Sequence, residues 1–150
     1  MKARVFYATI TGNNEDVADV IIDTFESEGV EVTKEDISMI DPHDISADET
    51  DIVVVVPYTF DKGTVPDESL DFFEDLEDAD LTGIFYGVSG SGDDFYGKDF
   101  AVAIDKFEAQ FEKSGATKGA DGVKVNLSPD VEATEELQAF TKALIEKANA

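Results

Sequence analysis

Five consecutive β-branched residues, Ile52-Val53-Val54-Val55-Val56, form a continuous apolar run near the centre of this 150-residue sequence. β-Branched side chains favour extended backbone, because they pack well on a pleated surface. A strand without alternating polar positions has both faces covered, which is typical of the inner strands of a parallel sheet between helices. The run therefore predicts a buried central strand of an α/β fold.

Short apolar segments alternate with segments of helical spacing on both sides of this run. Further strands are predicted at residues 5–8, 30–35, 83–88 and 122–127, and helices at residues 17–25, 66–76, 100–111 and 132–148. Gly29 and Gly115 are expected to end two of these helices. The alternation predicts a doubly wound, five-stranded parallel sheet with helices on both faces. No repeat or linker interrupts it, so we expect one domain over residues 1–150.

The charge of the chain restricts its partners. It carries 35 acidic and 11 basic residues, a net charge of −24. Such a surface repels nucleic acids and anionic membranes and attracts basic protein patches. Solvation or adaptation to salt would give the same excess of acids, so charge alone does not decide between these interpretations.

Several classes of site are excluded by composition. The absence of cysteine rules out disulfides, thiolate metal sites and a cysteine-dependent phosphatase. The only histidine, His43, lies in a predicted turn and is interpreted as a surface residue, and Asp93-Asp94 as a solvated rim, so we predict no metal site. No apolar run is long enough to span a bilayer, and a cytoplasmic protein is expected.

The loop after the first predicted strand has the features of an anion site. Thr9-Ile10-Thr11-Gly12-Asn13-Asn14 places hydroxyls, amides and backbone N–H groups at the start of a helix. It lacks the lysine and the glycine spacing of a Walker loop. Alternatively, Thr11 or Asn13 simply caps the helix.

Two further loops follow the third and fourth predicted strands. The first contains Pro57-Tyr58-Thr59-Phe60-Asp61-Lys62-Gly63, whose aromatic residues could cover the face of a flat ring. The second contains Ser89-Gly90-Ser91-Gly92-Asp93 followed by Phe95 and Tyr96, where glycines permit close backbone approach. Taken singly, these loops could also be a solvated turn and an unrelated glycine-rich turn.

The three loops together resemble those of short-chain flavodoxins. Thr-x-Thr-Gly-Asn is similar to the loop with which that family holds the phosphate of FMN by neutral donors. The resemblance implies strand order 2-1-3-4-5 and non-covalent FMN at the carboxyl ends of the strands. It implies flavin contacts from Phe60 and from Tyr96, which would stack on the outer face. Asn14 stands where the family usually has Thr or Ser, and its amide is expected to donate to the phosphate.

The second loop departs from the family pattern. Asp61 and Lys62 stand where Gly and Asp are usual. In the family, a peptide of this loop changes conformation when the flavin is reduced, and a residue other than glycine pays about 1 kcal/mol for positive φ. We therefore expect the one-electron-reduced flavin to be less stabilised, by about tens of millivolts.

The function implied by the resemblance is that of a low-potential one-electron carrier rather than an enzyme. Its partners would be redox enzymes with basic docking patches, such as flavodoxin or ferredoxin reductases, bound transiently to a monomer. Two alternatives stay open: a protein dedicated to one client enzyme, and a variant with weakened FMN binding. A signalling receiver domain would need acids and a lysine at strand ends, where this chain has Thr9-Ile10-Thr11, Pro57-Tyr58-Thr59 and Asn126-Leu127.

Overall fold

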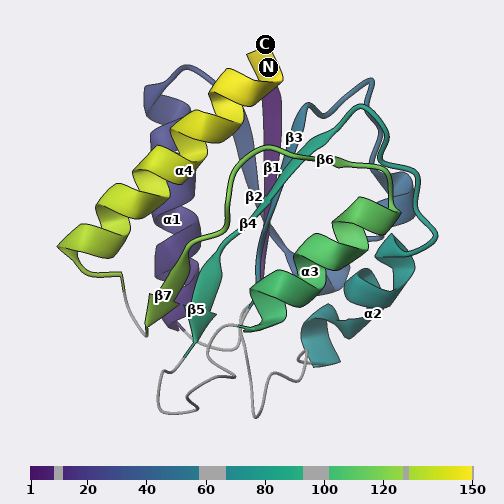
Figure 1. Cartoon of the computed structure of the whole chain (residues 1–150), viewed down its shortest axis with the longest axis horizontal. Coiled ribbons are helices and arrows are strands. Elements are labelled where there is room, and N and C mark those ends of the chain that lie inside the picture. The colour runs from purple at the N-terminus through teal and green to yellow at the C-terminus, as the bar shows by residue number, and fades with distance from the viewer. Residues whose placement is uncertain (9–11, 58–66, 93–101, 127–128, 150) are drawn as a thin grey trace.

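A computed structural model describes residues 1–8, 12–57, 67–92, 102–126 and 129–149 of the chain. Its main sheet has five strands in the order β2-β1-β3-β4-β6, and every pairing is parallel (Figure 1). This confirms the predicted fold class and strand order, with β6 in the fifth place. The strands are β1 (Lys2–Tyr7), β2 (Glu31–Asp36), β3 (Ile52–Val56), β4 (Phe85–Val88) and β6 (Thr117–Lys118).

The apolar run is the central strand, as predicted. β3 pairs with β1 on one side and β4 on the other, and each of its five residues is fully buried. Because successive side chains point to opposite faces, Val53 and Val55 join one core cluster while Ile52, Val54 and Val56 join the other.

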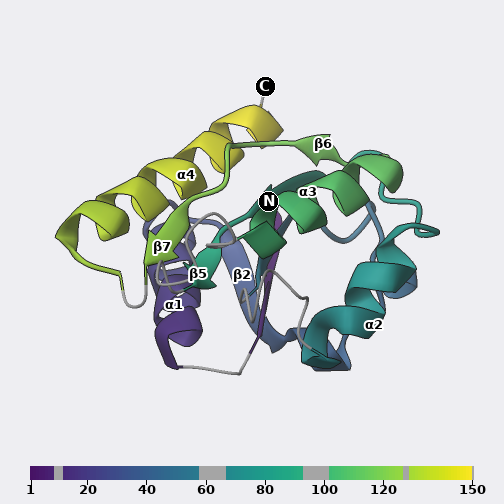
Figure 2. The same cartoon turned by 60° about the horizontal axis from the view of Figure 1, so that its bottom comes forward.

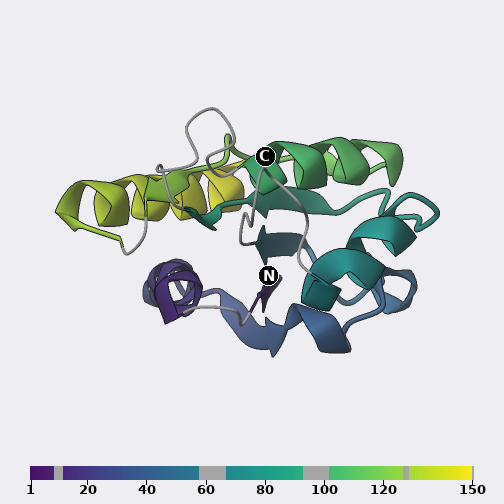
Figure 3. The same ribbon diagram turned by 90° about the horizontal axis from the view of Figure 1, so that it is seen from below.

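Two helix layers cover the two faces of the sheet. α1 (Gly12–Ser27) and α4 (Val131–Asn149) lie on one face, and α2 (Asp67–Leu76) and α3 (Val102–Lys113) lie on the other (Figure 3). Aromatic side chains fill the α2–α3 side, where the rings of Phe6 and Phe72 are 5.6 Å apart. Within the described ranges, no helix combines the length and apolar character needed to cross a membrane.

Glycines end two helices where the sequence predicted them to do so. Gly29 follows α1 with φ of 79° and Gly115 follows α3 with φ of 86°. Positive φ lets the chain leave the helix while the amides bond back to its last carbonyls. After α1, for example, the amide of Val30 donates to the carbonyl of Phe25 at 3.0 Å.

The turn predicted at residues 41–44 contains the 3₁₀ helix η2 (Pro42–Asp44), which follows a similar short helix, η1 (Ile37–Met39). The carboxylate of Asp41 caps η2 by accepting from the backbone N–H of His43 at 2.9 Å. The His43 side chain is 45% exposed. This agrees with its interpretation as a surface residue.

The prediction of one fifth strand at residues 122–127 was wrong in part. The strand that pairs with β4 in the main sheet is β6, at residues 117 and 118. Residues 124–126 form a separate strand, β7 (Lys124–Asn126), which pairs with β5 (Gly90–Gly92). The connection between them passes so close to its neighbours that a Cβ at Gly119 would lie 2.4 Å from Leu144 and one at Gly122 would lie 2.3 Å from the Val88 carbonyl. Glycine at both positions permits this close passage.

Candidate cofactor-binding site

The predicted site residues that the structure describes lie at one edge of the sheet. Those that the structure describes are Gly12, Asn13, Asn14, Pro57, Ser89, Gly90, Ser91 and Gly92, and the others (Thr9, Ile10, Thr11, Tyr58, Thr59, Phe60, Asp61, Lys62, Gly63, Asp93, Phe95 and Tyr96) lie outside the described residues. The three segments follow the carboxyl ends of β1, β3 and β4, which are neighbours in the sheet. All three predicted loops therefore leave the sheet from adjacent, parallel strand ends.

The carboxyl ends of β1 and β3 are joined by hydrogen bonds. The backbone N–H of Ala8 donates to the carbonyl of Val56 at 3.0 Å. The side-chain amide of Asn14 donates to the carbonyls of Ala8 and Val56, at 3.1 and 2.6 Å. Asn14 is fully buried. Both hydrogens of its amide nitrogen are therefore directed at backbone, whereas the sequence predicted that this amide donates to a phosphate.

The ends of β3 and β4 are in close contact. Pro57 follows β3 and is buried, and a Cβ built on Gly90 would lie 2.1 Å from its carbonyl oxygen. The sequence predicted that the glycines of this segment allow a ligand to approach. At Gly90, the group that approaches is the backbone of the neighbouring strand.

Ser89 and the residues after it form hydrogen bonds with the segment around β7. The hydroxyl of Ser89 accepts a hydrogen bond from the backbone N–H of Val123 at 2.8 Å. The N–H of Gly90 donates to the carbonyl of Val123 at 3.2 Å, and residues 90–92 then form β5 beside β7 (Figure 1 and Figure 2). The glycine-rich segment thus begins as a short strand, which the sequence did not predict.

α1 begins at Gly12, within the first predicted loop, whose last three residues form the first turn of the helix, and its N-terminal N–H groups lie at the carboxyl edge. The free N–H groups and the helix dipole favour an anion at such a position. The first turn also carries Glu15, which pairs with Lys34 at 3.5 Å, and Lys34 pairs with Asp19 at 2.9 Å. The pKa of Lys34 is raised by its hydrogen bond to Asp19 and by the negative charges of Asp19 and Glu15.

Lys2 and Arg4 lie on β1 away from its carboxyl end. Arg4 forms two hydrogen bonds with Glu35, at 2.9 and 2.8 Å, and this pairing lowers the pKa of the Glu35 carboxyl. The same ion pair borders a groove of about 520 Å³ lined by Lys2, Ala3, Arg4, Glu31, Thr33, Glu35, Glu49 and Thr50. The groove contains no aromatic residue and none of the predicted site residues, so it does not match the predicted site.

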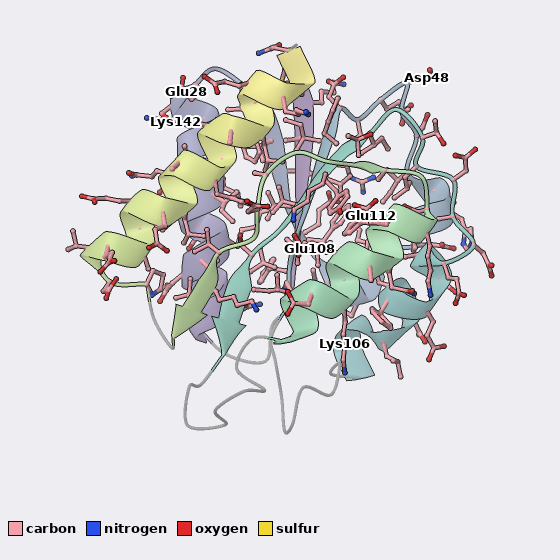
Figure 4. The ribbon with its side chains drawn as sticks, in the orientation of Figure 1. Glu28, Asp48, Lys106, Glu108, Glu112 and Lys142 are labelled. Carbon is pink, nitrogen blue, oxygen red and sulfur yellow. The ribbon has the colours of Figure 1, made fainter. Side chains whose placement is uncertain are left out.

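A second group of ionisable residues lies between α3 and the sheet (Figure 4). Glu108 is largely buried, with its side chain 18% exposed, and lies 3.4 Å from the ammonium group of Lys118. Burial raises the pKa of Glu108, and Lys118 opposes this effect. The atom that faces Lys118 is Oε2, which is buried and makes no hydrogen bond with the described residues beyond this ion pair. The hydroxyl of the buried Tyr86 donates to Glu112 at 2.6 Å. Burial raises the pKa of Tyr86, and the hydrogen bond to Glu112 raises it further.

One group of possible metal ligands occurs in the described part of the chain. Oxygen and nitrogen atoms of Asp41, His43 and Asp75 lie within 4.8 Å of one another, where η2 contacts α2. The closest pair is Asp41 and His43, with Oδ1 and Nδ1 2.8 Å apart. Exposed groups of this kind are common on acidic proteins, and this one is explained by the cap of η2.

Comparison with known proteins identifies the relatives of this chain. The family model of flavodoxin matches residues 5–140. "Probable flavodoxin 2" of Bacillus subtilis (strain 168) is 35% identical over 146 residues, which cover 97% of this chain and 95% of that protein. A solved short-chain flavodoxin associated with a PDU bacterial microcompartment is 47% identical, with a TM-score of 0.94 and 99% of both chains covered. The flavodoxin of Streptococcus pneumonia TIGR4 is 41% identical, with a TM-score of 0.92 and coverage of 98% and 99%.

Proposed function

The chain belongs to the flavodoxin family of FMN-binding electron-transfer proteins, and on this premise we propose that it is a low-potential carrier of single electrons between redox enzymes. FMN would bind without a covalent bond at the carboxyl ends of β1, β3 and β4. We also propose that residues 1–150 form one domain, which is supported by the coverage of 99% with a solved flavodoxin. Matches over nearly the whole chain favour a general carrier over a chain with weakened FMN binding.

The observation that carries the proposal is the order of the strands. β1 lies between β2 and β3, so the chain leaves β1 toward one side of the sheet and later crosses to the other. Such a switch point opens a crevice at the carboxyl ends of the strands, and flavodoxins are themselves the established example of FMN bound between strands one and three. Here the N-terminus of α1 lies at that point, directly after residues 9–11.

The residues at this edge suit FMN in their chemistry. Thr9, Thr11 and the backbone N–H groups at the start of α1 are neutral donors for a phosphate. Phe60 and Tyr96 would cover the two faces of the ring, and the segment from Ser91 to Asp93 would supply N–H groups to its edge. Bound FMN supplies the redox chemistry. The chain binds and orients it and excludes water from its faces.

The acidic surface supports both a low potential and the choice of partners. With 35 acids and 11 bases, the chain disfavours added negative charge on a bound group. The described residues of α2 include Asp71, Glu74 and Asp75 and no base in its last turn. Partner enzymes with basic patches would therefore dock transiently on a monomer, and the association should weaken as salt increases.

The test is a titration of the apoprotein with FMN, followed by stepwise reduction observed by visible absorbance. We expect submicromolar binding with quenched flavin fluorescence, and two separate one-electron steps. Thr11→Val should weaken FMN binding by about tenfold, because one phosphate donor is lost, and should leave riboflavin binding unchanged. Failure of the wild-type protein to bind at tens of micromolar FMN would refute the carrier function.

A further inference from the structure

A buried amide lies between the two strands that flank the proposed cofactor crevice. Asn14 is in the first turn of α1 and is fully buried. Its nitrogen donates to the carbonyls of Ala8 and Val56, which are 6 and 42 residues away in the sequence. These carbonyls belong to the last described residue before loop 9–11 and to the last residue of β3.

We infer that Asn14 is a positioning residue for the cofactor, because its amide fixes the distance between the strand ends from which two of the binding loops leave the sheet. The two hydrogens of the amide nitrogen are directed at strand carbonyls, so its contribution to binding is made through the backbone. This inference rests on the proposed function and deepens it, because it names a residue that acts on the shape of the crevice.

The chemistry of the side chain explains why an amide suits this position. The Val56 carbonyl already accepts from the N–H of Ala8 at 3.0 Å, so Asn14 adds a second donor there and also bonds to the carbonyl of Ala8. A primary amide presents two hydrogens from one nitrogen, whereas a hydroxyl has one and an ionised carboxylate has none. The amide of Asn14 joins the two carbonyls from the first turn of the helix.

The loss of Asn14 should affect ligand binding differently in this positioning role than in a phosphate contact. If Asn14 holds the strand ends, its loss widens the crevice for any ligand that enters it. If its side chain instead contacts the phosphate, its loss affects only ligands that carry one. FMN and riboflavin share the flavin ring and differ in the phosphate, so the ratio of their dissociation constants separates the two roles.

The experiment measures FMN and riboflavin binding by fluorescence quenching for the wild-type protein, N14A and N14S. We expect both variants to raise both dissociation constants by about tenfold, with their ratio unchanged within about a factor of two. Serine is a good phosphate donor but cannot reach both carbonyls, so it should not restore affinity. The control is Phe25→Leu, a fully buried position at the other end of α1, which should lower thermal stability without changing either dissociation constant.

A second readout needs no flavin. Hydrogen exchange of the Ala8 amide in the apoprotein should accelerate about tenfold in N14S relative to the Phe25→Leu control. A loss of affinity confined to FMN, or unchanged binding of both flavins, would overturn the inference. If wild type binds neither flavin, the proposed function fails, and the exchange rate of Ala8 alone then decides whether Asn14 holds the strand ends.

Discussion

Gly90→Ala tests how tightly the carboxyl edge is packed. A Cβ at this position would lie 2.1 Å from the Pro57 carbonyl oxygen, whereas ordinary contacts begin at 3.4 Å. Pro57, which follows β3, and the start of β5 at Gly90 must therefore separate by about 1.3 Å to admit one methyl group. Overpacking of this kind costs about 1–3 kcal/mol, and the smaller entropy of the unfolded alanine chain returns about 0.5 kcal/mol. We expect a net loss of about 1.5 kcal/mol in the free energy of unfolding.

The matched control is Gly29→Ala, at the end of α1. Gly29 has φ of +79° and no atom within 4 Å of its Cβ position, so alanine there incurs only the backbone penalty of about 1 kcal/mol. Urea unfolding of the apoprotein gives both free energies, and FMN titration gives the affinities. Gly90→Ala should also weaken FMN binding by about tenfold, and Gly29→Ala should not. Equal effects of the two substitutions on stability and on affinity would refute the close packing argued for this edge.

Three further predictions concern charge. Replacing the half-buried Glu108 with Met should raise the free energy of unfolding at pH 7 by about 1 kcal/mol. Because burial raises the folded pKa of Glu108, the lower stability of the wild type relative to this variant should disappear below about pH 4 in pH-dependent melting. Glu35→Gln should cost about 0.5 kcal/mol at pH 7. Since Arg4 lowers the pKa of Glu35, the difference from wild type should shrink as pH falls from about 4.3 and vanish below the lowered pKa of the folded protein, whereas a constant difference would contradict the pairing. Raising NaCl from about 0.1 to 1 M shortens the screening length from about 10 to 3 Å. Because the net charge is −24, weaker repulsion among the acidic side chains should raise the melting temperature by about 5 °C. A decrease in melting temperature would contradict net repulsion among these charges.

The sequence predicted the elements whose stability depends on local pattern. Ile52–Val56 has no alternation because both faces of β3 are covered, and this can be recognised without knowing its neighbours. The helix ends at Gly29 and Gly115 can also be predicted from local sequence, since each requires positive φ at only one residue. The strand order, in contrast, came from a resemblance, because periodicity does not specify which strands pair.

Sequence patterns did not reveal contacts with partners that are distant along the chain. The amide of Asn14 donates to a carbonyl 42 residues away. Ser89 was expected to belong to a ligand loop, and its hydroxyl accepts from Val123, 34 residues away. Glycine is needed at position 119 because a Cβ there would lie 2.4 Å from the side chain of Leu144. A small or polar residue after a strand indicates close contact, but the sequence does not state whether the contact is a ligand or another segment of the chain.

Two regions of the sheet are stabilised by different kinds of interaction. Between β1 and the edge strand β2, Arg4 and Glu35 form a charged pair with two hydrogen bonds. At the carboxyl ends of β1, β3 and β4, the bridges that the described residues show are made by neutral groups, the amide of Asn14 and the hydroxyl of Ser89. A neutral bridge fixes geometry without adding a charge beside the bound group, and a nearby charge would shift its reduction potential through space. Under the proposed function, Asn14 and Ser89 would therefore fix the position of the flavin loops, while the acidic surface would set the potential separately.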